Sequence, residues 1–205
     1  MLLPLVKKIL KENEKLFHSA KRPMKCHGPD HHKRVYNNAL LIAKRIHAHF
    51  DDDILAAACL LHDVAAYYPD TIGDHYHDFD YKIAKKILLK LNFPKAKLAR
   101  VLDAIKNHGS HSKYKRKDEP VEISLLRDAD KLDVFGPIGI MRMIMARTSR
   151  GDDISEIKGF FNIEYIKKKW KSITFDETRR LAKSDYVYSL NFFKNLTKKL
   201  NKVAE

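Results

Sequence analysis

Residues 52–66 have the sequence Asp-Asp-Ile-Leu-Ala-Ala-Ala-Cys-Leu-Leu-His-Asp-Val-Ala-Ala, an apolar stretch interrupted near its end by an imidazole and a carboxylate. Because aspartates favour the N-terminus of a helix, the stretch predicts a helix that runs to its end. Leu55, Cys59 and His62 are spaced by four and then three residues, which places His62 in line with the core-facing side chains. Asp63 follows about 100° further round the helix axis, so both side chains can be directed at one point.

Three more ionisable side chains lie in line with the apolar face of another predicted helix. They are His31 in a helix from an Asp30 N-cap to about Phe50, His108 at the end of a helix that begins at Pro94, and Asp130 in a helix from Pro120 to about Asp133. A carboxylate in an apolar interior must be neutralised or must bind a cation, and a divalent cation accepts both carboxylate oxygens and neutral imidazole nitrogens. The convergence therefore predicts a metal site for Mn, Mg, Fe, Co, Ni or Zn. A core of salt bridges without a metal explains so many acids and imidazoles less well.

Helical spacing of apolar residues extends along the whole chain, whereas strand-like alternation is hard to find and only 7 of the 205 residues are glycine. No internal repeat, low-complexity tract or linker divides the sequence. We therefore expect a single compact all-α domain. Further helices are predicted over residues 2–18, 77–91, 137–149 and 176–202, and residues 150–172 are ambiguous.

The chain carries 40 Lys and Arg against 26 Asp and Glu, which gives a net charge of +14. This balance favours a polyanionic partner such as a phosphorylated metabolite, nucleic acid or an acidic membrane surface. The alternative is a lysine-rich solvated surface, because Lys alternates with Glu, Asn and Leu at solvent-facing helix positions. For most of the charge we favour this second interpretation.

Composition excludes several classes of protein. Disorder is not expected of a chain with 44% hydrophobic and 10% aromatic residues spread along its length. Two cysteines, Cys26 and Cys59, cannot build a disulfide framework. No signal peptide opens the sequence, and no apolar run approaches the ~20 residues of a membrane-spanning helix. We therefore expect a soluble, cytoplasmic protein without a membrane partner.

Three motifs of the chain resemble those of the HD-domain metal-dependent phosphohydrolase superfamily. They are His31 before Arg34-Val35, the doublet His62-Asp63 at the end of its apolar run, and Asp130 within Asp128-Ala129-Asp130-Lys131-Leu132-Asp133. A single His-Asp pair is common by chance, whereas three motifs in this order on predicted helices are specific. Matches to one bacterial and archaeal branch extend the resemblance over roughly residues 27–200, namely residues 136–140 with Arg142, and residues 178–182 with Phe192-Phe193.

The resemblance implies one HD-type helical bundle over residues 1–205, with its core at about 27–150 and closing helices at 151–205. It also implies a divalent metal ion, whose identity it leaves open. The ligands implied for this ion are His31, His62, Asp63 and Asp130.

Several members of the superfamily carry a second metal, bound by extra histidines between the doublet and the last aspartate. His77 and His108 are the candidates in this chain. His108 has the better position because it lies on the apolar face of its helix, and His75 and His111 are weaker candidates.

The reaction implied is hydrolysis of a phosphorylated small molecule, in particular a nucleotide, by metal-activated water. Asp63 would bridge metals or orient the water. Lys131, directly after Asp130, is the first candidate for binding phosphate, followed by Arg34 and Arg142. The basic loop over residues 109–120 would close over a polyphosphate, or is simply a solvated loop.

Ala65-Ala66 stand where some nucleotidases and ppGpp hydrolases place an acid, and the signature of cyclic-di-GMP phosphodiesterases is missing, so those activities are not expected. Two alternatives to phosphohydrolysis stay open. One is an HD-fold di-iron oxygenase, with His77 and His108 as additional ligands. The other is a nucleic-acid-binding helical protein without catalysis, which is less favoured because buried His and Asp have no use there. The sequence does not indicate an oligomeric state.

Overall fold

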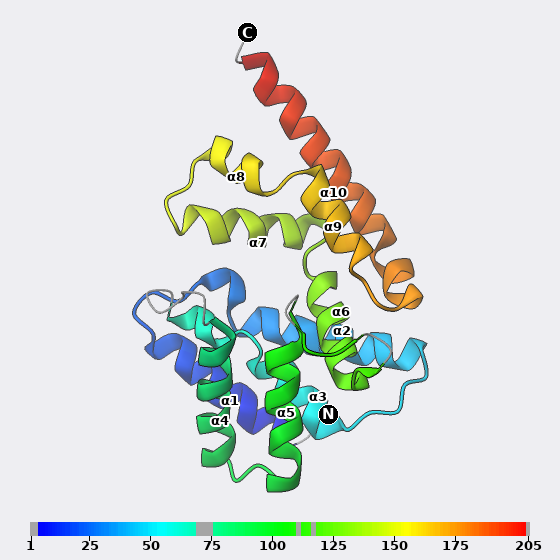
Figure 1. Ribbon diagram of the computed structural model, residues 1–205. Coiled ribbons are helices and arrows are strands. Elements are labelled where there is room, and N and C mark those ends of the chain that lie inside the picture. The colour runs from blue at the N-terminus through cyan, green and yellow to red at the C-terminus, as the bar shows by residue number, and fades with distance from the viewer. Residues whose placement is uncertain (1–3, 69–75, 110–111, 116–117, 204–205) are drawn as a thin grey trace. The chain divides into compact units, whose positions relative to one another are not determined.

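A computed structural model describes residues 4–68, 76–109, 112–115 and 118–203 (Figure 1). These residues form helices joined by turns and contain no β-strand, which confirms the predicted all-α fold class. The chain divides into two compact units, Met1–Ala129 and Asp130–Glu205. A single domain over the whole chain stays a prediction, and each unit is described by itself.

The first unit is built around one fully buried helix. Its elements are α1 (Pro4–Ser19), the 3₁₀ turn η1 (Lys25–His27), α2 (Pro29–Arg45), α3 (Asp52–Leu61), the 3₁₀ turn η2 (Val64–Tyr67), α4 (Tyr76–Lys90), α5 (Lys95–Asn107) and most of α6 (Val121–Leu132). Every residue of α3 from Ile54 onward is buried. A helix that is apolar on all sides must be covered on all sides, and α1, α2 and α5 pack against α3.

Helix α2 begins and ends earlier than the sequence predicts. Gly28 occupies the N-cap position and Pro29 the first helical position, where the missing N–H of proline costs nothing and its fixed φ suits the helix. The prediction of Asp30 as N-cap is therefore wrong, and Asp30 lies in the first turn. The helix stops at Arg45 because His47 adopts a φ of 52°, outside the right-handed helical region.

Helix α3 starts as predicted but ends before the His-Asp doublet. Asp51 is its N-cap, and its carboxylate accepts hydrogen bonds from the backbone N–H groups of Asp53 and Ile54 at 3.1 and 3.2 Å. The helix ends at Leu61 instead of running to Ala66. The reason lies in long-range hydrogen bonds, because the Ala65 N–H donates to a side chain of α4 and the Ala66 carbonyl accepts from the backbone of residue 24. These partners replace those of a continued helix.

The second unit contains the remaining helices. They are the C-terminal end of α6, α7 (Gly136–Thr148), α8 (Ile154–Phe160), α9 (Ile163–Lys171) and α10 (Asp176–Val203). The ambiguous residues 150–172 form two short helices, each with its own N-cap: Asp153 closes a capping box with Glu156, and Asn162 accepts from the Tyr165 N–H. The buried side chains of this unit are Phe135, Ile140, Met143, Ile166, Ile173, Ala182 and Phe193.

None of the helices within the described residues has the length and apolarity needed to span a membrane.

Candidate metal centre

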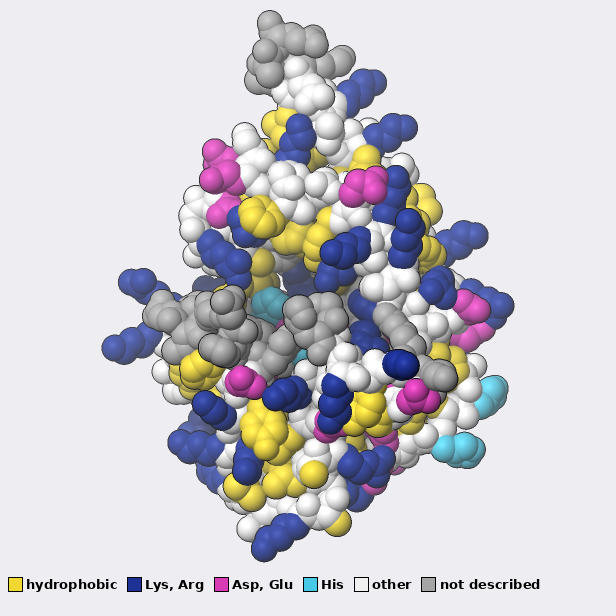
Figure 2. Space-filling view, viewed as in Figure 1, with side chains coloured by type: hydrophobic (Ala, Val, Ile, Leu, Met, Phe, Trp, Pro, Cys, Tyr) yellow, Lys and Arg dark blue, Asp and Glu magenta, His cyan; other side chains and the backbone are white. Residues whose placement is uncertain are grey.

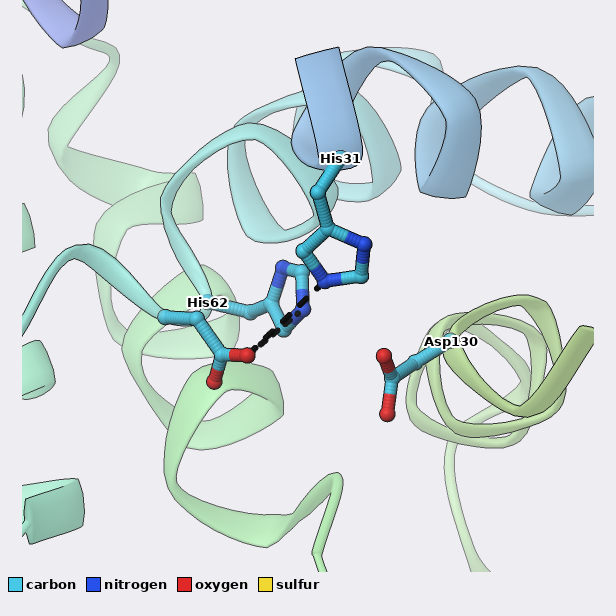
Figure 3. Close-up of side chains that lie close together, drawn as sticks. His31, His62 and Asp130 are labelled. Atoms are coloured by element: carbon cyan, nitrogen blue, oxygen red, sulfur yellow. Dashed lines mark ion pairs between the residues drawn. The ribbon is translucent and has the colours of Figure 1, made fainter. Parts of the chain in front are cut away.

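Two imidazoles and two carboxylates come together in the structure. His31 lies in the first turn of α2, His62 caps the C-terminus of α3, Asp63 follows it, and Asp130 lies in the last turn of α6. One ligand atom of each residue lies within 4.8 Å of the others, and all but Asp130 are buried. Figure 3 shows the side chains of His31, His62 and Asp130 directed toward one another from separate helices. Although Asp130 opens the second unit, it is carried by α6, most of whose residues belong to the first.

A backbone carbonyl determines which ring nitrogen of His62 carries the proton. Its Nδ1 lies 2.9 Å from the carbonyl oxygen of Cys59, and because a carbonyl only accepts, Nδ1 carries the proton. The lone pair is then on Nε2, which lies 3.4 Å from Asp63 Oδ2. Two atoms that both accept repel each other unless a cation lies near them. The donor set therefore fits a divalent metal ion, for which neutral imidazole nitrogen and carboxylate oxygen are suitable ligands.

Asp63 is the centre of the local electrostatics. Burial by itself raises the pKa of its carboxyl group, but the neighbouring imidazoles, His62 first and the hydrogen-bonding His27 next, outweigh burial and hold the pKa well below its ordinary value. Its Oδ2 lies 3.8 Å from His31 Nε2 (Figure 3, dashed line). Asp63 therefore stays ionised and offers an anionic ligand.

His108, the first candidate for a second metal, lies on the other side of the same carboxylate. Its Nδ1 donates to the Ile105 carbonyl at 2.6 Å, so Nε2 has the lone pair, and this nitrogen lies 3.8 Å from Asp63 Oδ1. A second metal at this position stays a prediction. His77 lies in α4, but its side chain is outside the described residues, as are His75 and His111.

The C-terminus of α5, which carries His108, is held by an arginine of α6. Arg127 donates from Nε to the carbonyl of His108 at 2.9 Å and from Nη2 to the carbonyl of Asn107 at 2.7 Å. The same guanidinium pairs with the buried Glu119, which also accepts from Ser124. Arg127 thus satisfies helix-terminal carbonyls and fixes His108 relative to the helix of Asp130.

Sequence reasoning missed Asp80, which supports the doublet from α4. Its side chain is fully buried, and Oδ1 accepts the Ala65 N–H at 2.7 Å. Burial, together with the nearby charge of Asp63, raises the pKa of Asp80 well above its ordinary value. The signal was present, because Asp80 lies in line with the buried Ala84 and Ile87 at helical spacing, as the predicted ligands lie in line with apolar residues of their own helices.

His32, next to His31, was also missed and belongs to a buried polar network. Its Nδ1 lies 2.7 Å from Asn13 Nδ2, which also donates to the Leu60 carbonyl. Tyr67 donates from its hydroxyl to Asn13 Oδ1 at 2.6 Å. Burial and the neighbouring histidines hold the pKa of His32 well below its ordinary value, so the ring stays neutral. The network ties α1 to the end of α3. The ring centroid of His32 lies 4.9 Å from that of His62.

The cations predicted to bind phosphate are not members of the ligand cluster. Arg34 is half-buried on α2. Within the second unit, Lys131 donates to the Ser172 carbonyl, and Arg142 forms an ion pair with Asp133 at 3.1 Å. Their role in phosphate binding stays a prediction. In the basic loop, Lys113 pairs with Asp103 and Lys115 is exposed, while Arg116 and Lys117 lie outside the described residues.

The fold is shared with solved bacterial structures. A Lactobacillus plantarum protein has a TM-score of 0.76 at 19% identity, over 98% of this chain and 100% of that chain. Bacillus subtilis YpgQ in complex with ADP has a TM-score of 0.69 at 22% identity, over 95% of this chain and 97% of that chain. An HD-superfamily hydrolase from Bacillus thuringiensis has a TM-score of 0.66 at 21% identity, over 96% of each chain. At these identities the similarity shows the fold. No curated protein matches the chain.

The sequence itself identifies the family. The family model of the HD domain matches residues 30–134, which is more than half of the chain. The matched range contains the two imidazoles and two carboxylates that the structure brings together. The chain therefore belongs to the HD-domain family.

Proposed function

We propose that the protein is a metal-dependent phosphohydrolase that cleaves a phosphoester or phosphoanhydride bond of a nucleotide or a related phosphorylated metabolite. The observation that carries the proposal is the convergence of His31, His62, Asp63 and Asp130 within 4.8 Å. These residues would hold a divalent ion, which supplies an acidified water and a Lewis acid for the phosphate oxygens.

The residues of the chain have separate parts in this reaction. His31, His62, Asp63 and Asp130 would serve as ligands. Asp63, kept ionised by its surroundings, would also orient the attacking water by accepting a hydrogen bond from it. Lys131, Arg34 and Arg142 are proposed to bind the phosphate oxygens and to stabilise the negative charge of the transition state.

Two observations support a nucleotide as the substrate. YpgQ, whose fold this chain shares, has been crystallised in complex with ADP. The net charge of +14 raises the local concentration of anionic metabolites around the protein. A di-iron oxygenase is the second candidate, favoured by the lone pair of His108 beside Asp63 Oδ1.

The test is purified protein with Mn²⁺, Mg²⁺, Ni²⁺ or Co²⁺ and a panel of nucleotides, with phosphate and pyrophosphate release measured separately. We expect metal-dependent turnover that His62→Ala and Asp130→Ala each lower by about 100-fold or more, because each removes a ligand. His49→Ala and Asp52→Ala, at exposed positions of the same residue types, should keep full turnover. Unchanged turnover in both ligand variants would contradict the proposal. Iron with an absorption band of the oxidised metal and no phosphate release would favour the oxygenase.

A further inference from the structure

Among the histidines whose side chains the structure describes, the nitrogen nearest to Asp63 Oδ2 belongs to a residue outside the ligand set. His27 Nδ1 lies 2.8 Å from this oxygen, against 3.4 Å for His62 Nε2 and 3.8 Å for His31 Nε2. An ionised carboxylate only accepts, so His27 Nδ1 carries a proton and donates it in the hydrogen bond. This nitrogen therefore has no lone pair to offer to a metal.

The backbone around His27 is fastened to the backbone around Asp63. His27 ends the turn η1, and its N–H donates to the Met24 carbonyl at 2.9 Å. The N–H of Met24 in turn donates to the Ala66 carbonyl at 2.9 Å, in the turn η2 that Asp63 begins. Two turns that are far apart in the sequence are thus joined directly beside the carboxylate.

Packing fixes the other side of the turn. A Cβ at Gly28 would lie 3.2 Å from the Phe17 ring and 3.2 Å from the Lys25 carbonyl, so α1 packs closely against this backbone. The rings of His27 and His31 then meet edge to face, with centroids 5.5 Å apart. Although the His27 side chain is 27% exposed, these contacts fix its position.

We infer that His27 is a positioning residue of the metal centre, whose Nδ1–H fixes the rotation of the Asp63 carboxylate and so would leave its remaining lone pairs available to a bound ion. The inference rests on the metal site proposed above and adds a residue that lies before the matched HD range. Hydrogen bonds to a ligating carboxylate orient it, and the loss of such a partner typically lowers metal affinity by about 10–100-fold.

Three substitutions of His27 separate donation at Nδ1 from other roles. The amide nitrogen of Asn is three bonds from Cα, as Nδ1 of His is, whereas that of Gln is four bonds away, as Nε2 is. We expect His27→Asn to keep the affinity for Mn²⁺ within about threefold of the native protein. His27→Gln and His27→Ala should weaken it by about 10–100-fold. The measurement is isothermal titration calorimetry of metal-free protein with Mn²⁺ and no substrate.

Controls keep the result independent of folding and of turnover. His49→Ala, an exposed position on the same unit, should bind Mn²⁺ like the native protein. If His27→Ala fails to fold, the comparison of His27→Asn with His27→Gln still tests the inference. Native affinity in every His27 variant would overturn the inference, and so would an equal loss in every variant, Asn included. The predicted pattern together with no phosphate release would overturn the proposed hydrolase and leave the role of His27 standing.

Discussion

At the scale of single residues, a carbonyl oxygen beside one ring nitrogen decides what the other ring nitrogen can bind. The carbonyls of Cys59 and Ile105 fix the protons of His62 and His108 on Nδ1, so both rings present a lone pair to Asp63. His32 is the opposite case. The amide nitrogen of Asn13 donates to the Leu60 carbonyl, and it also donates to His32 Nδ1, which therefore accepts. The proton of His32 is therefore on Nε2, which excludes it as a ligand in this tautomer.

The Asn13 network gives a prediction for stability. Asn13→Leu keeps the volume but removes the side chain that donates to the Leu60 carbonyl and to His32 Nδ1 and that accepts from the Tyr67 hydroxyl. The Tyr67 hydroxyl and His32 Nδ1 then keep only their 3.2 Å contact with each other. We expect the free energy of unfolding to fall by about 3 kcal/mol, because each buried polar group left without a partner costs about 1–3 kcal/mol. Urea denaturation followed by circular dichroism measures the change.

The matched control is Asn37→Leu, which places the same substitution at an exposed position of α2. It should change the free energy of unfolding by less than about 0.5 kcal/mol. A similar loss in both variants would show that the buried hydrogen bonds of Asn13 contribute little.

Most of the site residues that could be predicted continue the apolar stripe of a helix, although Asp80 does so and was missed. His31, His62 and Asp130 do, and the sequence predicts them. Asn13 also does, after the buried Val6 and Ile9, but a single amide on a helix is not a distinctive signal. His27 lies in a 3₁₀ turn between prolines, where no periodicity exists, so its contact with Asp63 follows only from the folded backbone.

At the scale of elements, the existence of a helix could be predicted and its end often could not. Apolar spacing is a local property of the sequence, and it gives α1, α7 and α10 to within two residues at each end. The ends of α2 and α3 depend on partners elsewhere in the chain. For α3 these partners include Asp80, which lies fifteen residues after Ala65 and whose carboxylate accepts the Ala65 N–H. Such partners are known only when the fold is known.

Close approach of the backbone at the start of α7 gives a second stability prediction. A Cβ at Gly139 would lie 2.0 Å from the Val134 carbonyl oxygen, a backbone atom that cannot rotate away. We expect Gly139→Ala to lower the free energy of unfolding by about 1–3 kcal/mol, as overpacking in a well-packed interior does. Guanidinium denaturation monitored by Trp170 fluorescence reports on this unit, because Trp170 stacks on Tyr186 within it.

Gly159→Ala provides the control for Gly139→Ala. Gly159 lies inside α8, and a Cβ there would meet nothing within 4 Å. The same substitution should stabilise that helix by up to about 1 kcal/mol, because alanine has the higher helix propensity. Loss of stability at both positions would mean that steric contact with Val134 is not the cause.

At the scale of the whole molecule, the charge of +14 is distributed and partly compensated. Figure 2 shows Lys and Arg side chains over the visible face with acidic and apolar side chains between them. Several cations are paired, among them Lys33 with Glu14 at 2.8 Å and Lys97 with Asp51 at 3.0 Å. Such a surface attracts small anions, and on the visible face of the described residues its Lys and Arg side chains do not form a continuous basic stripe.

Binding to DNA therefore provides the last prediction. A duplex without a specific site should bind with a Kd no tighter than about 10⁻⁶ M at physiological salt. The affinity should fall steeply between about 50 and 200 mM salt. Both properties are typical of non-specific contacts with phosphates. Because those contacts do not involve the buried cluster, Mn²⁺ and the Asp130→Ala substitution should leave the affinity unchanged. Fluorescence anisotropy with a labelled duplex measures both dependences. Nanomolar binding that persists at high salt would instead identify nucleic acid as the partner and the lysine surface as its site.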